Sequence, residues 1–318
     1  MRFALMTEPQ QGLSYDEVLA LASTAEGVGF ESYFRSDHYA SFPGDAGLPT
    51  TDAWATLAGL ARDTRRITLG TLVSPVTFRQ PGNFAKVVTT VAEMSGGRVE
   101  VGLGAGWNDL EHRQHGIPFP SDGERFEMLE EQLAILHGLW TEPDGWSYSG
   151  RHWQVSDAQF YPKPPAPLGR RHPNIIIGGK GRARMADLVA RFADEFNLTS
   201  ASPEAAGPAY ERIRTACTRH GRDGTEVTLS AMTGVLVGRT QAEVERRSQD
   251  LLRVVGARGV DADAWLEDRA RRWVFGTPDQ ARARVAEFEA AGVERLMLQD
   301  FQPRDLEMIR LLGRTFLG

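Results

Sequence analysis

Asn174-Ile-Ile-Ile-Gly-Gly-Lys-Gly181, followed by Arg182-Ala-Arg-Met-Ala-Asp-Leu-Val-Ala-Arg-Phe192, is the stretch that decides the fold. Its isoleucines predict a strand buried on both faces, its glycines a tight turn, and the apolar spacing after them an amphipathic helix. The start of such a helix has free backbone N–H groups and the positive end of the helix dipole. Lys180, Arg182 and Arg184 add positive charge there. The stretch therefore predicts an anion site, usually for phosphate, with a ligand-free turn as the alternative.

This glycine turn differs from the two common nucleotide motifs. It lacks the Gly-Lys-Ser/Thr ending of the P-loop, and its glycine spacing is not that of the dinucleotide fingerprint. The turn alone therefore does not identify a nucleotide.

Eight strand candidates alternate with helical segments along the chain. The strands are predicted at 2–6, 31–35, 66–73, 98–104, 174–178, 194–198, 227–237 and 294–299. The helices are predicted at 15–28, 52–63, 83–94, 123–140, 182–193, 203–220, 241–255, 278–291 and 304–315. This order predicts the α/β class and a (β/α)8 TIM barrel. A doubly wound open sheet is the alternative, but it would be expected to carry a dinucleotide fingerprint near its first strand.

The 318 residues fit a single barrel domain, 1–318, with three insertions at the carboxyl-end face. The insertions cover about 37–51, 141–173 and 256–276, and the second includes a predicted hairpin at 146–153. Insertions of this size usually form active-site walls or a lid. We expect all three to surround the active site.

Composition limits the partners and the compartment. The net charge of −6 does not suggest a nucleic-acid or anionic-membrane partner. The single cysteine, Cys217, allows no disulfide within the chain and fits a reducing cytosol. We see no signal peptide and no apolar run long enough to span a bilayer. These features predict a cytoplasmic protein that acts on a small molecule.

Polar residues at the carboxyl ends of the predicted strands are the candidates for chemistry, because barrel active sites lie there. Asp37 and His38 follow the second strand, and His38 is the only histidine at such an end. An imidazole can exchange a proton near neutral pH, so His38 is a candidate acid or base. The alternative is that Asp37 and His38 only close a turn. A metal site is not predicted: Glu111, His112 and His115 share a helix face but are too few for zinc.

Several segments together resemble a known family. The chain is similar over nearly its whole length to the luciferase-like flavin and deazaflavin oxidoreductases, in the branch that uses coenzyme F-420. The resemblance rests on five segments, which are Phe34–His38, Ile67–Pro75 with Phe78–Pro81, Gly97–Trp107, Pro173–Gly179 and Ala193–Asn197.

This resemblance implies a (β/α)8 barrel, usually a homodimer, with a flavin-like ring deep in the carboxyl-end pocket and its phosphate on the glycine turn. It implies a bulge in the third strand with a cis peptide bond at Leu72–Val73. It also implies that His38 contacts the edge of the cofactor ring or the substrate. Asp37, which precedes His38, is expected to orient the His38 ring or to favour its charged form. The implied cofactor-binding residues are Leu72, Val73, Ser74, Ala105, Gly106, Trp107, Asn108, Gly178, Gly179, Lys180, Gly181, Arg182 and Asn197.

The function implied by the resemblance is hydride transfer between reduced coenzyme F-420, an 8-hydroxy-5-deazaflavin, and a small organic substrate. An apolar or aromatic substrate is suggested by four pocket candidates, Phe42, Trp107, Trp265 and Trp273. Ala105 stands where several relatives have a glutamate, so their substrates do not transfer to this chain. The alternatives are an FMN-dependent monooxygenase of the same fold, which uses molecular oxygen, and a non-catalytic flavin-binding barrel.

Overall fold

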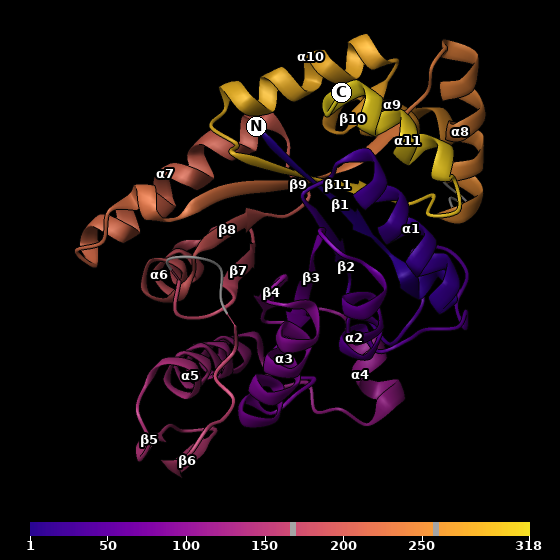
Figure 1. The fold of residues 1–318 in the computed structure, drawn as a ribbon. Helices are drawn as coiled ribbons and strands as arrows, with labels where there is room; N and C mark the ends of the chain where they lie inside the picture. Colours follow the sequence, from indigo (N-terminus) through magenta and orange to yellow (C-terminus); the bar gives the residue numbers. More distant parts are fainter. Residues whose placement is uncertain (166–169, 257–260) are drawn as a thin grey trace.

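Eight parallel strands close into a barrel in the computed structural model, which describes residues 1–165, 170–256 and 261–318 (Figure 1). Strand β9 pairs with both β8 and β11, and β11 pairs with β1, so the sheet has no open edge between them. The (β/α)8 barrel prediction is confirmed. The barrel strands are β1 (Arg2–Thr7), β2 (Ser32–Arg35), β3 (Thr68–Pro75), β4 (Val99–Gly104), β7 (Asn174–Gly179), β8 (Glu195–Leu198), β9 (Thr228–Val237) and β11 (Arg295–Asp300).

Helices surround the barrel, and all nine that the sequence predicts are present. They are α1 (Tyr15–Val28), α2 (Ala53–Asp63), α3 (Pro81–Ser95), α5 (Asp122–Thr141), α6 (Ala183–Phe192), α7 (Pro203–Arg219), α8 (Gln241–Val254), α10 (Pro278–Ala290) and α11 (Leu306–Phe316). The described residues also contain α4 (Asp109–His115), the helix on which Glu111, His112 and His115 were placed. They add elements that were not predicted, namely the short η1 (Pro9–Gln11) and η2 (Gly224–Glu226), the helix α9 (Ala262–Arg272) and the strand β10 (Val274–Gly276). In the described ranges, no helix is long and apolar enough to cross a membrane.

A buried ion cluster fills the amino-terminal end of the barrel. The guanidinium of Arg295 is fully buried and lies within ion-pair distance of Glu31, Glu100 and Glu195, each at or just before the start of a strand. Burial raises the pKa of Glu100, and the charge of Arg295 opposes that rise. Because one arginine bridges three strand ends, this end of the barrel is closed to ligands, and a ligand must enter from the carboxyl ends.

Strand β3 carries the predicted bulge. Its register against β4 shifts between Thr71 and Ser74, and the Leu72–Val73 peptide bond is cis, as the resemblance implied. The Val73 side chain lies against two glycines of neighbouring strands. A Cβ atom at Gly104 would lie 2.7 Å from Val73 Cγ2, and one at Gly178 would lie 2.8 Å from Val73 Cγ1. The two glycines therefore make the space into which the bulge fits.

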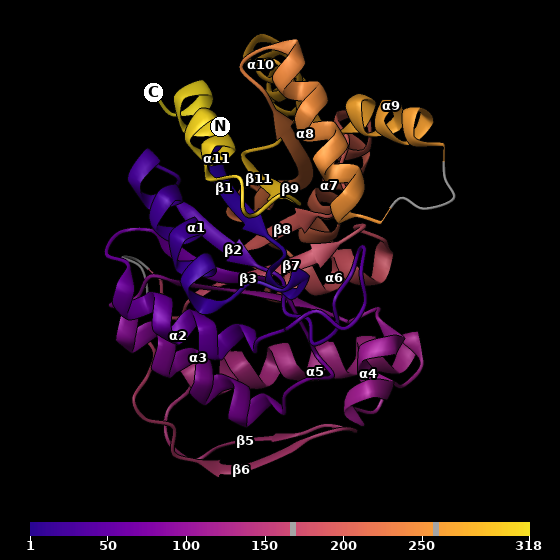
Figure 2. The same ribbon diagram turned by 90° about the vertical axis from the view of Figure 1, so that its right-hand side faces the viewer.

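The insertions do not all lie where we expected. Residues 166–169 and 257–260, in the second and third insertions, lie outside the described residues. The hairpin of β5 (Trp146–Ser149) and β6 (Gln154–Ala158) is present, but it packs outside α5, as Figure 2 shows. Glu131 of α5 holds it by accepting hydrogen bonds from the backbone N–H groups of residues 151–153. Its position is thus fixed by α5 and not by a ligand.

Candidate active site

A cavity of about 750 Å³ lies at the carboxyl ends of the strands, within the usual range for small-molecule sites. It is lined by ten of the residues predicted to act or to bind cofactor: His38, Leu72, Val73, Ala105, Gly106, Trp107, Gly178, Gly179, Lys180 and Arg182. Of the three predicted insertions, only the first contributes to it, since none of the described residues of 141–173 and 256–276 lines this cavity. The cavity has an apolar wall and two chemically different ends.

The apolar wall is formed by the β3 bulge and its neighbours. Leu72 and Val73 line it, together with Ala105 after β4 and the side chains of Met6 and Met232 from β1 and β9. These groups form no strong hydrogen bonds, so they favour contact with a flat apolar surface over contact with a polar one.

The glycine turn forms a cationic end. Lys180, Arg182 and Arg184 all line the cavity there. Helix α6 begins at Ala183, and in the described part of the chain the Arg182 side chain makes no capping hydrogen bond to its first turn. Burial, followed by the nearby charge of Arg272, lowers the pKa of Lys180. Such an end suits an anionic group, because free helix N–H groups and nearby cations both stabilise negative charge.

Replacing Gly179 with valine should weaken the binding of a phosphate-bearing cofactor by about 1–3 kcal/mol. A Cβ atom at Gly179 would lie 2.3 Å from Cε of Met185, which lines the same cavity, so the added side chain must displace Met185 and change the shape of this part of the cavity. Fluorescence titration measures the loss. Gly207→Ala is the matched control, because no heavy atom lies within 4 Å of the added Cβ in α7. Unchanged affinity in the Gly179 variant would show that the turn is only structural.

The opposite end contains a histidine paired with a carboxylate. His38 Nδ1 lies 2.9 Å from Oε1 of Glu111, which is 1% exposed and comes from α4. The His38 ring also meets the edges of two aromatic rings, with centroid distances of 4.5 Å to Phe42 and 5.8 Å to Trp107. All four side chains line the cavity. They form a pocket with one titratable group between aromatic surfaces.

A second carboxylate, Glu8, lines the cavity at the end of β1. It is 5% exposed and accepts hydrogen bonds from the amides of Gln10 at 2.6 Å and Gln299 at 2.5 Å. Both partners are neutral side chains, and within the described residues no ion pair involves Glu8. An anionic substrate group close to Glu8 is therefore unfavourable.

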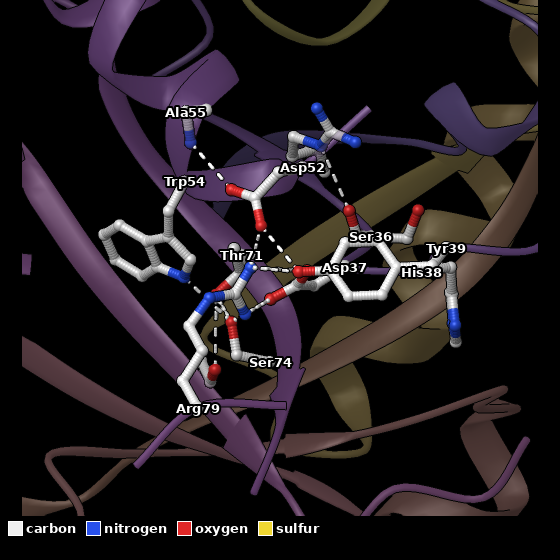
Figure 3. A network of polar contacts seen from close by, with 12 residues as sticks. Ser36, Asp37, His38, Tyr39, Asp52, Trp54, Ala55, Thr71, Ser74 and Arg79 are labelled. Carbon is white, nitrogen blue, oxygen red and sulfur yellow. Dashed lines mark hydrogen bonds and ion pairs between the residues drawn. The ribbon is translucent and has the colours of Figure 1, made fainter. Parts of the chain in front are cut away.

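Asp37 lies behind the cavity and does not line it. Its side chain is fully buried, accepts a 2.6 Å hydrogen bond from Ser74 Oγ, and forms an ion pair with Arg79 at 2.6 Å. Arg79 also contacts Asp52 and the Tyr39 hydroxyl, and Figure 3 shows this network with the His38 ring away from it. Burial tends to raise the pKa of Asp52, but Arg79, the Tyr39 hydroxyl and the Ala55 N–H group together outweigh it, and the net shift is downward. Asp37 thus joins the end of β2 to the β3 bulge.

The expectation that Asp37 orients the His38 ring is therefore wrong. The carboxylate of Asp37 is engaged by Arg79 and Ser74, whereas the ring nitrogen of His38 is held by Glu111. Asp37 therefore faces the network behind the barrel wall, whereas His38 lines the cavity.

Comparisons with known proteins identify the family of this chain. Residues 1–295 match the family described as luciferase-like monooxygenase. This chain belongs to that family. An uncharacterised protein of Mycobacterium tuberculosis is 30% identical over 292 residues, which cover 87% of this chain and 91% of the relative. An F420-dependent glucose-6-phosphate dehydrogenase of Microbacterium testaceum is 27% identical over 336 residues, which cover 100% of this chain and 96% of the relative.

Solved structures share the barrel of this luciferase-like protein. An F420-dependent secondary alcohol dehydrogenase in complex with an F420-acetone adduct has a TM-score of 0.84 at 20% identity, over 99% of this chain and 98% of that one. The monooxygenase RslO1 from Streptomyces bottropensis has a TM-score of 0.83 at 21% identity, over 100% of this chain and 99% of that one. At these identities the likeness shows the fold, and the family as a whole consists of oxidoreductases.

Four of the predicted cofactor residues of this luciferase-like protein do not line the cavity. Ser74 bonds to Asp37, and Asn108 caps α4 by accepting from the Leu110 N–H group. Gly181 has a φ of 61°, and a Cβ atom added at this position would lie 3.0 Å from the Phe196 ring. Asn197 is fully buried and donates to Ser230 Oγ at 2.9 Å. None of the four lines the cavity, and their role as cofactor-binding residues stays a prediction.

Trp265 and Trp273 were predicted to shape the pocket, but neither lines the cavity. Their rings pack edge to face with centroids 6.2 Å apart, and Trp273 stacks on Phe301 at 5.3 Å. They fill the space between α9 and the end of the barrel, so only Phe42 and Trp107 of the predicted aromatic residues face a ligand.

No metal centre is seen in the parts of the chain that the structure describes, where no group of three or more His, Cys, Asp or Glu could hold an ion. His112, one of the residues considered for zinc, is buried between Thr77 Oγ1 at 2.6 Å and the backbone oxygen of Asn108 at 2.7 Å. Both its nitrogens are thus engaged by protein groups.

Proposed function

We propose that this protein is an oxidoreductase that transfers a hydride between reduced coenzyme F-420 and a small, uncharged apolar or aromatic substrate. The observation that carries the proposal is the division of one cavity into a cationic glycine turn, an apolar wall at the β3 bulge and the His38–Glu111 end. A deazaflavin has matching parts, with an anionic tail, a flat apolar ring and a reactive edge. The F420-dependent relatives support this choice.

The residues of the cavity fit such a cofactor. Gly179, Lys180 and Arg182 would hold its phosphate, and Leu72 and Val73 would back its ring. When bound, the reduced cofactor supplies the hydride. The protein then has to exclude water, align the substrate and move one proton, and His38 is the side chain placed to give or take it.

The substrate is expected to pack between Phe42 and Trp107, whose ring centroids are 5.2 Å apart. Trp107 is 65% exposed, which is unusual for a tryptophan in a folded chain and leaves its ring free to cover a ligand. The carboxylate of Glu8, which has only neutral amide partners, disfavours an anionic substrate group close to it in the cavity.

An FMN-dependent monooxygenase is the second candidate, supported by a pyrimidine monooxygenase, RutA of Stutzerimonas stutzeri, that is 31% identical over 229 residues. That match covers 70% of this chain and 61% of the relative. One assay separates the two functions. Under anaerobic conditions, a hydride-transfer enzyme oxidises reduced coenzyme F-420 when ketones or unsaturated compounds are supplied, or reduces the oxidised coenzyme when alcohols are supplied. Oxygen uptake with reduced FMN, and no anaerobic turnover, would favour the monooxygenase.

A barrel that only binds a flavin would show cofactor binding and no turnover in either arm of this assay.

We also propose that the protein acts in the cytoplasm and that it is a homodimer, as the family resemblance implies. Sedimentation velocity of the purified protein tests the dimer.

A further inference from the structure

We propose that Glu111 is the positioning residue of His38, and that it fixes the proton of the neutral imidazole on Nδ1. The lone pair is then on Nε2, the nitrogen that a substrate can reach. Glu111 lies in α4 and not at a strand end, and from the sequence it was considered only as a possible zinc ligand. Its effect on turnover rests on the proposed function, whereas the proton position does not.

The first argument is the direction of the hydrogen bond. Glu111 Oε1 lies 2.9 Å from His38 Nδ1, and a carboxylate can only accept. The bond therefore requires a proton on Nδ1. No hydrogen-bond partner of Nε2 is found among the described residues, so the protein itself does not compete for that nitrogen.

The second argument is that the carboxylate is itself immobilised. Its other oxygen, Oε2, accepts from the backbone N–H groups of Tyr39 at 2.9 Å and Ala40 at 3.4 Å. These backbone groups follow His38 directly, so one side chain holds both the ring and the turn that carries it. Glu111 is 1% exposed, and the short helix α4 is fixed by its neighbour His112, which bonds to Thr77 Oγ1. The ring therefore has a fixed partner on a fixed support.

The third argument is that no other described side chain is placed to orient this ring. Asp37 is engaged by Arg79 and Ser74, and the remaining close neighbours of His38, the rings of Phe42 and Trp107, make only edge contacts. Packing restricts the ring plane but does not choose between its two nitrogens. The choice thus depends on Glu111.

A glutamine at position 111 should reverse the proton position. The backbone N–H groups of Tyr39 and Ala40 can only donate, so the glutamine oxygen must face them. Its NH₂ group then faces His38 Nδ1, which must accept, and the ring proton moves to Nε2. Shape and packing change little, because the two side chains have nearly the same volume.

Long-range ¹H–¹⁵N NMR of protein labelled at histidine tests the proposal, recorded at alkaline pH where imidazoles are neutral. All seven histidines lie in described ranges, and the His38→Gln variant assigns the His38 signals. We expect the Nδ1–H form for wild-type His38 and the Nε2–H form for Glu111→Gln. His112 provides an internal reference, because Asn108 O holds its Nδ1 proton. His220→Gln is the matched control, because the His220 ring bonds to Asp187 and neither residue lines the cavity, and it should leave the His38 spectrum unchanged.

The wild-type spectrum alone is decisive, so the proposal stays testable even if a variant does not fold. A wild-type His38 in the Nε2–H form, or an unchanged form in folded Glu111→Gln, would overturn it. With the cofactor and a substrate, Glu111→Gln should lower kcat roughly a hundredfold while the cofactor dissociation constant changes little. Failure of the proposed function would instead show as absent wild-type turnover, with the NMR result intact.

Discussion

Replacing His38 with alanine is expected to lower turnover by about a hundredfold to ten-thousandfold while cofactor affinity changes little. Hydride addition to a polarised double bond leaves an anion that must take a proton, and the reverse reaction must lose one. Within the described cavity lining, His38 is the only imidazole, and it stands between the aromatic rings where we expect the substrate. Single-turnover oxidation of the reduced cofactor, with saturating substrate, measures the loss.

His38→Gln separates this role from a purely steric one. Glutamine keeps much of the volume and one hydrogen-bond donor but cannot exchange a proton near neutral pH. A proton-transfer role requires turnover to be slow in both His38 variants. In the control variant His220→Ala, whose native side chain bonds to Asp187 and does not line the cavity, turnover should be near that of the wild type. Near-wild-type turnover in both His38 variants would exclude His38 as the proton donor or acceptor.

Replacing Arg79 with methionine is expected to lower the free energy of unfolding by about 3–5 kcal/mol. The change removes the cation that pairs with Asp37, which is fully buried, and with Asp52. An uncompensated buried carboxylate is costly, and here it lies where β2 joins the β3 bulge. Urea denaturation followed by circular dichroism measures the loss.

Two further variants identify the cause of that loss. Arg113→Met removes an exposed ion pair with Asp109 and should cost less than about 1 kcal/mol. Adding Asp37→Asn to Arg79→Met removes the unpaired charge and should restore part of the stability. If Arg79→Met were no more destabilising than Arg113→Met, the network in Figure 3 would not be what holds the two strand ends together.

The strands and the glycine turn could be predicted because their signals are local. Buried parallel strands give continuous apolar runs such as 174–178, and the turn after them needs glycines. The bulge at Leu72–Val73 was not predicted from such a signal. It followed only from the resemblance, since apolar periodicity does not distinguish a bulged strand from a regular one.

The side chains at the His38 end could not be assigned from the sequence. Glu111 lies in α4, well after the end of β4, and no spacing rule connects it to a histidine 73 positions earlier. Glu8 follows β1 directly and could have been found by the strand-end rule, but it was not considered. Trp265 and Trp273 were misjudged because tryptophans in an insertion pack internally as readily as they face a ligand.

The most direct test of the account is fluorescence titration of the purified protein with coenzyme F-420 and with FMN under the same conditions. The cationic turn at Lys180 and Arg182 suits the longer phosphodiester tail of the deazaflavin. We predict a dissociation constant for coenzyme F-420 that is micromolar or tighter, and weaker binding of FMN. Clearly tighter binding of FMN would contradict the central claim.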